Sequence, residues 1–143
     1  MRIYLACTVR GDRGTIDTAR HIHDRLVALG HDVLTSHLLR DDVESIENRL
    51  TDRDIFDRDL AWLISADVIV AEASGSSYGV GFEVGFVLGH AAHTGQRALV
   101  MYDASRQGTV SRLISGLAHP RAAVLAYESL AGIDAFLDAQ LAG

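Results

Sequence analysis

Short apolar segments alternate with longer amphipathic segments along the whole chain, and this alternation constrains the fold more than any other feature of the sequence. The apolar segments predict five strands, at residues 2–7, 32–36, 66–73, 97–103 and 122–127. The segments that follow them predict five helices, at residues 15–29, 49–65, 79–93, 109–118 and 129–141. Because parallel strands need long crossover connections, this order predicts a three-layer α/β sandwich, a five-stranded parallel sheet with helices on both faces.

The loops that follow the strands are where such a fold binds ligands, because ligands sit beyond the carboxyl ends of the strands. Three loops meet this condition: residues 8–14, the segment that starts at residue 37, and residues 74–78. Residues 37–48 are polar and give no clear secondary-structure prediction. The sequence therefore places a candidate site at one edge of the sheet and leaves the middle loop unassigned.

Length and composition limit the classes of protein that the chain represents. Its 143 residues fit a single domain, 1–143, which buries a core without disulfides. No apolar run approaches the ~20 residues of a membrane span, the first residues lack the apolar core of a signal peptide, and the one Cys forms no internal disulfide. We therefore expect a cytoplasmic protein that binds no membrane. The net charge of -6 argues against nucleic acid as a partner.

Glu83 is the first candidate for chemistry. It lies in a predicted helix with apolar residues on nearly every side, G-V-G-F-E-V-G-F-V-L-G, and we expect this helix to be buried. Burying a lone carboxylate is costly unless something compensates. A capping box needs Ser or Thr at position 80, which is Val, although an acid in a first turn also stabilises the helix dipole. The apolar surroundings favour a functional carboxylate, either a nucleophile or a base.

Asp59 is the second candidate. Its neighbours three and four positions away along the predicted helix are all apolar: Ile55, Phe56, Trp62 and Leu63. An acid on such a face either caps a loop or pairs with a buried Arg, or it takes part in catalysis, and the sequence favours neither alternative. Two acids in unlike environments are the usual pair for breaking a glycosyl bond, one as nucleophile and one as proton donor.

Two glycine-containing loops predict a binding site for an anion. The loop 74–78 brings Ser77 and Gly79 to a helix start, where free backbone N–H groups favour negative charge. The loop 8–14 brings Arg10, and a guanidinium binds phosphate through two parallel hydrogen bonds. Neither loop matches a Walker A or dinucleotide motif, and each alone is equally consistent with an ordinary turn. Together they predict one phosphate held between two loops.

The remaining candidates have plainer interpretations. The seven His have no metal-ligand spacing, so we expect no metal and no cofactor. Cys7 ends a buried strand and is expected to be packed, not reactive. Tyr4 lies in the middle of a strand, where composition alone predicts core. Ser111 lies beside an apolar stripe that is either core or a dimer face: Val110, Leu113, Ile114 and Leu117.

Three segments taken together carry a family resemblance: I-Y-L-A-C-T-V-R-G-D-R, D-R-D-L-A-W-L-I-S-A-D-V-I-V-A-E-A-S-G-S-S-Y-G-V-G-F-E-V-G and G-T-V-S-R-L-I-S-G. From Ile3 to about Tyr127 the chain resembles the nucleoside 2-deoxyribosyltransferase superfamily, and within it the 2'-deoxynucleoside 5'-monophosphate N-glycosidase branch. The middle segment is the most specific part. The resemblance implies a flavodoxin-like, Rossmann-like sheet and a homodimer with sites shared across its interface.

The resemblance also implies a role for individual residues. Glu83 matches the nucleophile that attacks C1' of the sugar, Asp59 the carboxylate that assists departure of the base, and Tyr4 the tyrosine that positions the nucleophile. The residues that match the phosphate site are Thr8, Val9, Arg10, Gly11, Ser77, Gly79 and, contributed from the partner subunit, Ser111. His37 falls near the nucleotide, and Cys7 stands near the sugar or base where the branch has Gly.

We therefore expect an enzyme that hydrolyses the N-glycosidic bond of (2'-deoxy)nucleoside 5'-monophosphates. The products are free base and (deoxy)ribose 5-phosphate, formed through a covalent glycosyl intermediate on Glu83. Two alternatives use the same carboxylate: base exchange between unphosphorylated nucleosides, and hydrolysis of a ribonucleotide such as CMP. A third, of another class, is a non-catalytic module that binds a nucleotide or a flavin. The sequence leaves open the base, the 2' substituent of the sugar and the role of residues 37–48.

Overall fold

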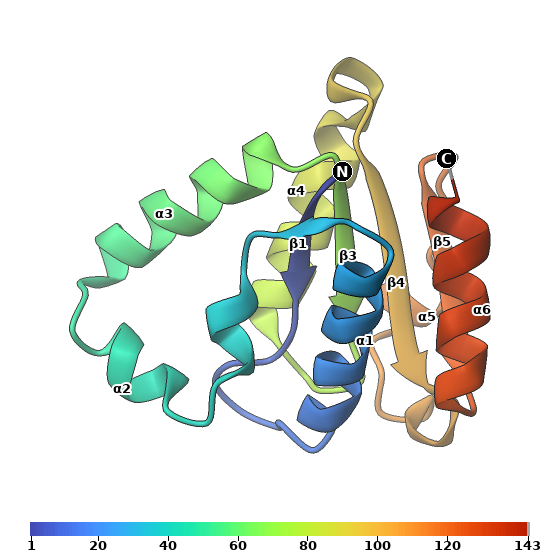
Figure 1. Ribbon diagram of the computed structural model, residues 1–143, viewed down its shortest axis with the longest axis horizontal. Helices are drawn as coiled ribbons and strands as arrows, with labels where there is room; N and C mark the ends of the chain where they lie inside the picture. Colours follow the sequence, from blue (N-terminus) through green and yellow to red (C-terminus); the bar gives the residue numbers. More distant parts are fainter. Residues whose placement is uncertain (143) are drawn as a thin grey trace.

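In this computed structural model, which describes residues 1–142, five strands form one parallel sheet in the order β2-β1-β3-β4-β5 (Figure 1). The strands are β1 (Arg2–Ala6), β2 (Asp32–Val33), β3 (Val68–Glu72), β4 (Arg97–Asp103) and β5 (Ala122–Tyr127). This strand order is that of flavodoxin-like doubly wound folds. The prediction of an α/β fold with a five-stranded parallel sheet is confirmed.

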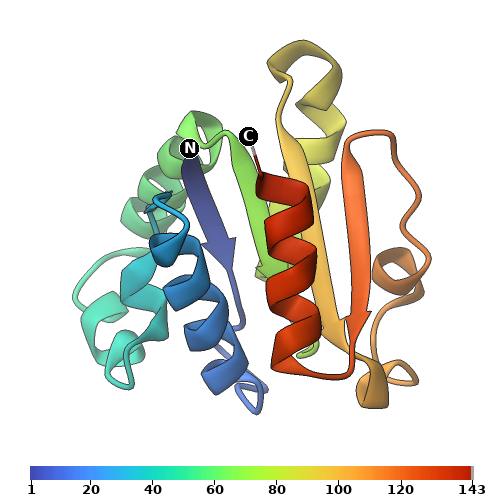
Figure 2. The same cartoon turned by 45° about the vertical axis from the view of Figure 1, so that its right-hand side comes forward.

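Helices cover both faces of the sheet (Figures 1 and 2). They are α1 (Ile16–Ala28), α2 (Val43–Glu47), α3 (Asp52–Ser65), α4 (Tyr78–Thr94), α5 (Arg112–Ser115) and α6 (Leu130–Leu141), with short 3-10 helices η1 (Ser36–Leu39) and η2 (Ala104–Arg106). The apolar sides of α1 and α6 pack on one face of the sheet, and those of α3 and α4 pack on the other. No helix within residues 1–142 is long and apolar enough to cross a membrane.

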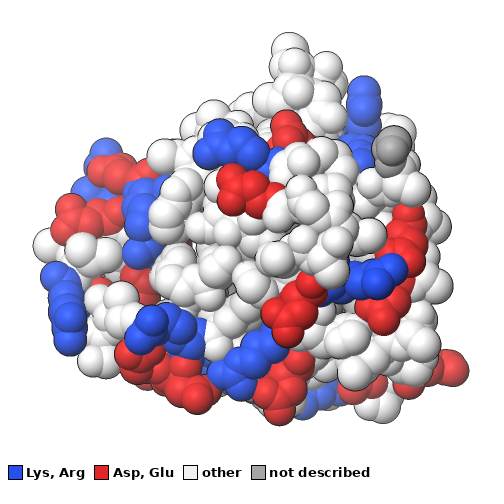
Figure 3. All heavy atoms as spheres, viewed as in Figure 1, with Lys and Arg blue, Asp and Glu red and all other residues white. Residues whose placement is uncertain are grey.

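The centre of the sheet is buried on both faces. All five residues of β3 are buried, and in β1 only Arg2 is exposed. Such strands read as continuous apolar runs, which is why the sequence predicted them well. Outside the core, polar side-chain contacts join α1 to α6: Arg25 forms an ion pair with Asp138, and Nε2 of His21 lies 2.8 Å from Oδ1 of Asp134. Acidic and basic side chains lie next to one another over the face seen in Figure 3.

The loops that follow β1 and β3 pack against each other at one edge of the sheet. β1 and β3 are neighbours, yet β1 leads into α1 on one face and β3 leads into α4 on the other. Gly75 lies so close to the loop after β1 that no side chain fits there. A Cβ at this position would stand 2.5 Å from the carbonyl oxygen of Asp12. Beneath these loops, the buried carboxylate of Glu72 accepts hydrogen bonds from Thr15 (Oγ1, 2.6 Å), Tyr127 (hydroxyl, 2.9 Å) and Ser74.

Several predicted element boundaries differ from the structure. The helix predicted at residues 49–65 begins at Asp52, because Thr51 and Asp54 form a capping box in front of it. The helix predicted at residues 109–118 is a single turn, α5, capped by Ser111. The strand predicted at residues 32–36 has only two residues and leads directly into η1.

Helix α4 is not buried all round, so that prediction is wrong for the single chain. Val80, Val84, Val87 and Ala91 face the core. On the other side Tyr78 is fully exposed, Phe82 is 54% exposed, and a Cβ at Gly81 or Gly85 would meet no atom within 4 Å. The apolar second side of α4 therefore consists of glycine backbone and aromatic rings that one chain leaves uncovered.

Candidate active site

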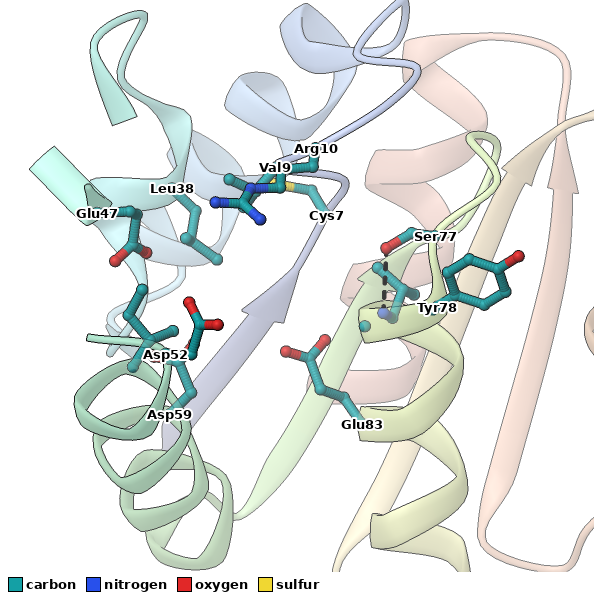
Figure 4. Close-up of a pocket in the computed structure, with 13 residues that line it drawn as sticks. Cys7, Val9, Arg10, Leu38, Glu47, Asp52, Asp59, Ser77, Tyr78 and Glu83 are labelled. Atoms are coloured by element: carbon teal, nitrogen blue, oxygen red, sulfur yellow. Dashed lines mark hydrogen bonds between the residues drawn. The ribbon is translucent and has the colours of Figure 1, made fainter. Parts of the chain in front are cut away.

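A cavity of about 380 Å³ lies at the carboxyl ends of β1 and β3, beside α2, α3 and the start of α4 (Figure 4). Four carboxylates line it, those of Glu47, Asp52, Asp59 and Glu83. Arg10 and the residues around the N-terminus of α4, Ser77 to Val80, line the same cavity. In Figure 4 the Glu83 carboxylate points from α4 toward the wall that carries Asp59, while Arg10 and Ser77 lie toward the loops. The cavity therefore has an acidic side and a side suited to an anion.

The Glu83 carboxylate is held by Tyr4. The hydroxyl of Tyr4 donates a hydrogen bond of 2.6 Å to Oε1 of Glu83, although the rest of the Tyr4 side chain is core. Burial, with a smaller contribution from the charge of Asp59, raises the pKa of Glu83 to about 7, although the hydrogen bond from Tyr4 opposes this rise. Burial together with the charge of Glu83 raises the pKa of Tyr4, so this hydroxyl keeps its proton and remains a donor. Glu83 is therefore partly ionised near neutral pH.

Asp59 stands beside this pair and is itself paired. It lines a smaller cavity of about 140 Å³ together with Tyr4 and Glu83. Nε of Arg58 donates a hydrogen bond of 2.8 Å to Oδ1 of Asp59. Burial raises the pKa of Asp59, and the hydrogen bond and charge of Arg58 oppose that rise. Asp59 therefore pairs with an Arg and also lines a cavity with Glu83, and its part in catalysis stays a prediction.

The residues predicted to bind phosphate fall into three groups. Val9, Arg10, Ser77 and Gly79 line the 380 Å³ cavity. Ser77 is the N-cap of α4, where its hydroxyl accepts a hydrogen bond of 3.2 Å from the N–H of Val80. Arg10 is exposed and makes no hydrogen bond or ion pair with any other residue in the described range 1–142. Its guanidinium is therefore available to an anion.

Thr8 and Gly11 lie outside that lining. The Thr8 hydroxyl is buried without a protein partner in the described part of the chain, and a Cβ on Gly75 would stand 2.8 Å from it. Gly11 has a φ of 103°, a conformation that favours glycine, at the turn beside the Ser76 carbonyl. Both residues shape the loop after β1 in this chain.

Ser111 lies in a second cavity, of about 650 Å³, on the outer side of α4. Ser77, Tyr78 and Val80 line both cavities, so the N-terminus of α4 is the wall between them. The Ser111 hydroxyl accepts a hydrogen bond from the N–H of Leu113, and it lines only the second cavity in this chain.

His37 and Cys7 occupy the margins of the site. Cys7 lines the 380 Å³ cavity, and burial raises the pKa of its thiol to about 11, so the thiol stays protonated. The His37 ring packs against Trp62 with centroids 5.4 Å apart, and burial lowers the pKa of its imidazole. Within residues 1–142 no group of three or more His, Cys, Asp or Glu is arranged to hold a metal ion.

Three charged residues at the site escaped the sequence analysis: Glu47, Asp52 and Arg58. Glu47 comes from the unassigned segment, where α2 carries its carboxylate to Arg58. Only one local signal was available: Arg58 precedes Trp62 by four positions, the spacing at which helix side chains meet, and its guanidinium lies 5.0 Å from the Trp62 ring centroid.

Comparison with known proteins identifies the family. The family model for nucleoside 2-deoxyribosyltransferase matches residues 3–112. A Thermofilum pendens relative, a candidate 2'-deoxynucleoside 5'-phosphate N-hydrolase, is 35% identical over 100% of this chain and 96% of its own. The 5-hydroxymethyl-dUMP N-hydrolase of Esox lucius is 34% identical over 81% of this chain and 79% of its own.

A solved structure shares the fold. The CMP N-glycosidase of Clostridium botulinum superposes with a TM-score of 0.66 and 16% identity, over 98% of this chain and 99% of that one. The family model and the relative that matches over the whole chain give the same assignment. The chain belongs to the nucleoside 2-deoxyribosyltransferase family.

Proposed function

We propose that the protein is an enzyme that hydrolyses nucleoside 5'-monophosphates at the bond between base and sugar. The observation that carries this proposal is the Glu83 carboxylate, which is hydrogen-bonded to Tyr4 and lies with Asp59 in the cavity that Arg10 and Ser77 also line. One end of this cavity suits a phosphate. The acidic side holds Glu83 and Asp59, two carboxylates in unlike environments. The relatives named as N-hydrolases support the same reaction class.

In the first step, an ionised Oε of Glu83 attacks C1' of the sugar. The bond between C1' and the base nitrogen breaks, and its electron pair leaves with the base. Asp59, in its protonated form, gives its proton to the departing base, and a glycosyl ester remains on Glu83. Tyr4 keeps the attacking carboxylate oriented through its 2.6 Å hydrogen bond.

In the second step, a water molecule attacks C1' and gives a proton to the carboxylate of Asp59. The bond between C1' and the Glu83 oxygen breaks, which releases the sugar 5-phosphate and restores the Glu83 carboxylate. Two displacements at the same carbon retain the configuration at C1'. Asp59 ends the cycle with the proton that it needs for the next base.

The phosphate lies at the loop end of the cavity in this proposal. Arg10 provides a free guanidinium, and the N-terminus of α4 provides backbone N–H groups behind Ser77. Base exchange between nucleosides would not need this end of the cavity. The base itself stays open, because the relatives and the structural neighbour act on 5-hydroxymethyl-dUMP in one case and CMP in another.

We also propose a homodimer in which the glycine face of α4 is covered by a second copy. Gly81, Gly85, Leu113 and Tyr78 line the 650 Å³ cavity, and Leu113 is 85% exposed. Small residues on this face allow a second helix to approach closely. In such a dimer Ser111 reaches the phosphate of the neighbouring site, which accounts for its absence from the 380 Å³ cavity of its own chain.

The test is release of free base from a panel of ribo- and deoxynucleoside 5'-monophosphates, with the matching unphosphorylated nucleosides as controls. We expect at least one monophosphate to be hydrolysed and its nucleoside to react poorly. Glu83→Ala abolishes release, and Arg10→Ala raises KM for the monophosphate while Arg121→Ala, at another exposed Arg, does not. Full activity of Glu83→Ala, or faster turnover of nucleosides, contradicts the proposal.

A further inference from the structure

Three charged side chains form a continuous chain along the acidic wall of the cavity: Glu47, Arg58 and Asp59. The Arg58 guanidinium donates one hydrogen bond of 2.8 Å to Oδ1 of Asp59, through Nε, and another of 2.9 Å to Oε1 of Glu47, through a terminal nitrogen. One positive charge is therefore shared by two carboxylates. Asp59 takes part in the steps proposed above, whereas those steps do not use Glu47 or Arg58.

The surroundings hold this chain in one arrangement. Glu47 is only 8% exposed, and the side chains of Arg58 and Asp59 are 23% and 25% exposed. The Arg58 guanidinium packs over Trp62, and His37 packs against the same ring. A guanidinium packed on an aromatic ring and bound at both edges has little freedom to turn. The segment 37–48, unassigned from sequence, thus supplies the carboxylate that competes with Asp59.

This sharing has a direct electrostatic consequence. An Arg that pairs with Asp59 alone favours its ionised form, which has no proton to give to a base. A second carboxylate on the same guanidinium weakens that effect, because its negative charge opposes the Arg at short range. We propose that Glu47 and Arg58 are positioning residues, which orient Asp59 and keep it able to carry the proton for the departing base.

Every charged group that faces Asp59 fits this account. Arg58 on α3 lowers the pKa of Asp59, and Glu47 on α2 raises it. His37 on η1 lowers it slightly when charged, but burial lowers the pKa of His37 and keeps it neutral near pH 7. On the far side stands the Tyr4–Glu83 pair, whose carboxylate interacts with that of Asp59. Burial raises the pKa of Asp59 most, and among the charged groups around it Arg58 and Glu47 act in opposite directions.

The first test measures Asp59 directly and does not depend on activity. The pKa of Asp59 is read from its 13C-carboxyl NMR signal, which is assigned by its loss in Asp59→Asn. We expect Glu47→Gln to lower this pKa by roughly one unit and Arg58→Gln to raise it by a similar amount. Arg58→Lys keeps the charge and moves it less than Arg58→Gln. The matched control is Glu44→Gln, at an exposed acid of the same helix.

The second test is kinetic and rests on the proposed function. The limb of the kcat–pH profile whose midpoint follows the Asp59 pKa read by NMR reports the proton of Asp59. It should move to lower pH in Glu47→Gln and to higher pH in Arg58→Gln, while KM changes less than about threefold. In the double variant Glu47→Gln/Arg58→Gln the limb returns toward that of the wild type.

The outcomes separate the two proposals. If no monophosphate is hydrolysed, the proposed function fails, and the NMR titration alone decides the inference. If the pKa of Asp59 is the same in the wild type and Glu47→Gln, the inference is overturned. It is also overturned if Glu47→Gln raises KM without moving the limb that reports Asp59, because Glu47 then contacts the substrate instead of acting through Arg58.

Discussion

The Tyr4 hydroxyl donates the one hydrogen bond that Glu83 accepts through its side chain within the described residues. This bond stabilises the ionised carboxylate, so its removal in Tyr4→Phe raises the pKa of Glu83 above about 7. A hydrogen bond to a charged group contributes about 1.5–3 kcal/mol, which corresponds to one or two pH units. The acidic limb of kcat/KM should therefore move to higher pH.

The loss of kcat/KM in Tyr4→Phe should be large at pH 6 and small at pH 9. We expect about a tenfold loss of kcat/KM at the lower pH and less than a threefold loss at the higher one. Tyr102→Phe is the matched control, because Tyr102 is also a buried strand tyrosine but its hydroxyl makes no hydrogen bond to a carboxylate within residues 1–142. An unchanged pH profile would show that Tyr4 is only a core residue.

The Glu83 carboxylate should also lower the stability of the fold at alkaline pH. Its pKa is about 7 in the folded protein against 4.5 for the free side chain, so the folded state binds the proton more tightly. Stability due to this group is present below about pH 4.5 and is lost as the pH rises through 7. Glu83→Gln removes this loss, which is on the order of 2–3 kcal/mol at pH 8.

Urea unfolding of Glu83→Gln and the wild type at both ends of this window checks the sign. The variant should be the more stable protein at pH 8 and nearly equal to the wild type at pH 4.5. Equal differences at both pH values would mean that the substitution acts through packing and not through the proton.

At the scale of elements, the loops after β1 and β3 pack so closely that Gly75 has no space for a side chain. A Cβ at Gly75 would stand 2.5 Å from the Asp12 carbonyl oxygen, and backbone cannot move aside as a side chain does. Gly75→Ala should push the loops apart, raise KM for the monophosphate about tenfold or more and change kcat less. Gly108→Ala, where the added Cβ meets no atom within 4 Å, should leave both constants unchanged.

The elements that the sequence predicted best are those whose pattern is set by burial alone. β3 and β4 are largely buried on both faces, and the predicted bounds of β4, 97–103, are confirmed, whereas β3 is shorter, at Val68–Glu72, than the predicted 66–73. The segment 37–48 gave no prediction because its order comes from other elements. Arg13 donates to the Leu38 carbonyl oxygen, and Arg20 donates to that of Leu39. A sequence pattern does not contain such contacts between loops and helices.

Part of the site was predictable from the sequence and part was not. Glu83 and Asp59 stood out as acids on apolar helix faces, and the structure brings both to one cavity. Glu47 did not stand out, because α2 is short and its partner Arg58 lies eleven positions later on another helix. The side of α4 that faces away from the sheet was misjudged, because an apolar helix face does not reveal whether this chain or a second copy covers it.

At the scale of the whole molecule, the proposed dimer makes one face of α4 sensitive to charge. Leu113→Asp places a carboxylate on an apolar surface that a second copy should cover, and we expect the mass measured by light scattering to halve. Activity should fall with it, since Ser111 then reaches no neighbouring phosphate. Leu130→Asp, at an exposed apolar residue of α6, is the control. A protein that is already monomeric, with full activity, contradicts the dimer.

The four carboxylates of the cavity also determine how a substrate arrives. A monophosphate dianion approaches a protein of net charge -6 through a mouth lined by acids, and only at close range does the free Arg10 attract it. Added salt shortens the Debye length to about 10 Å at 0.1 M, which screens the distant repulsion before it screens the contact with Arg10. The rate of substrate capture, measured as kcat/KM, should therefore rise with salt, pass through a maximum and then fall. Electrostatic steering in this protein thus acts as a barrier to encounter, and moderate ionic strength lowers that barrier.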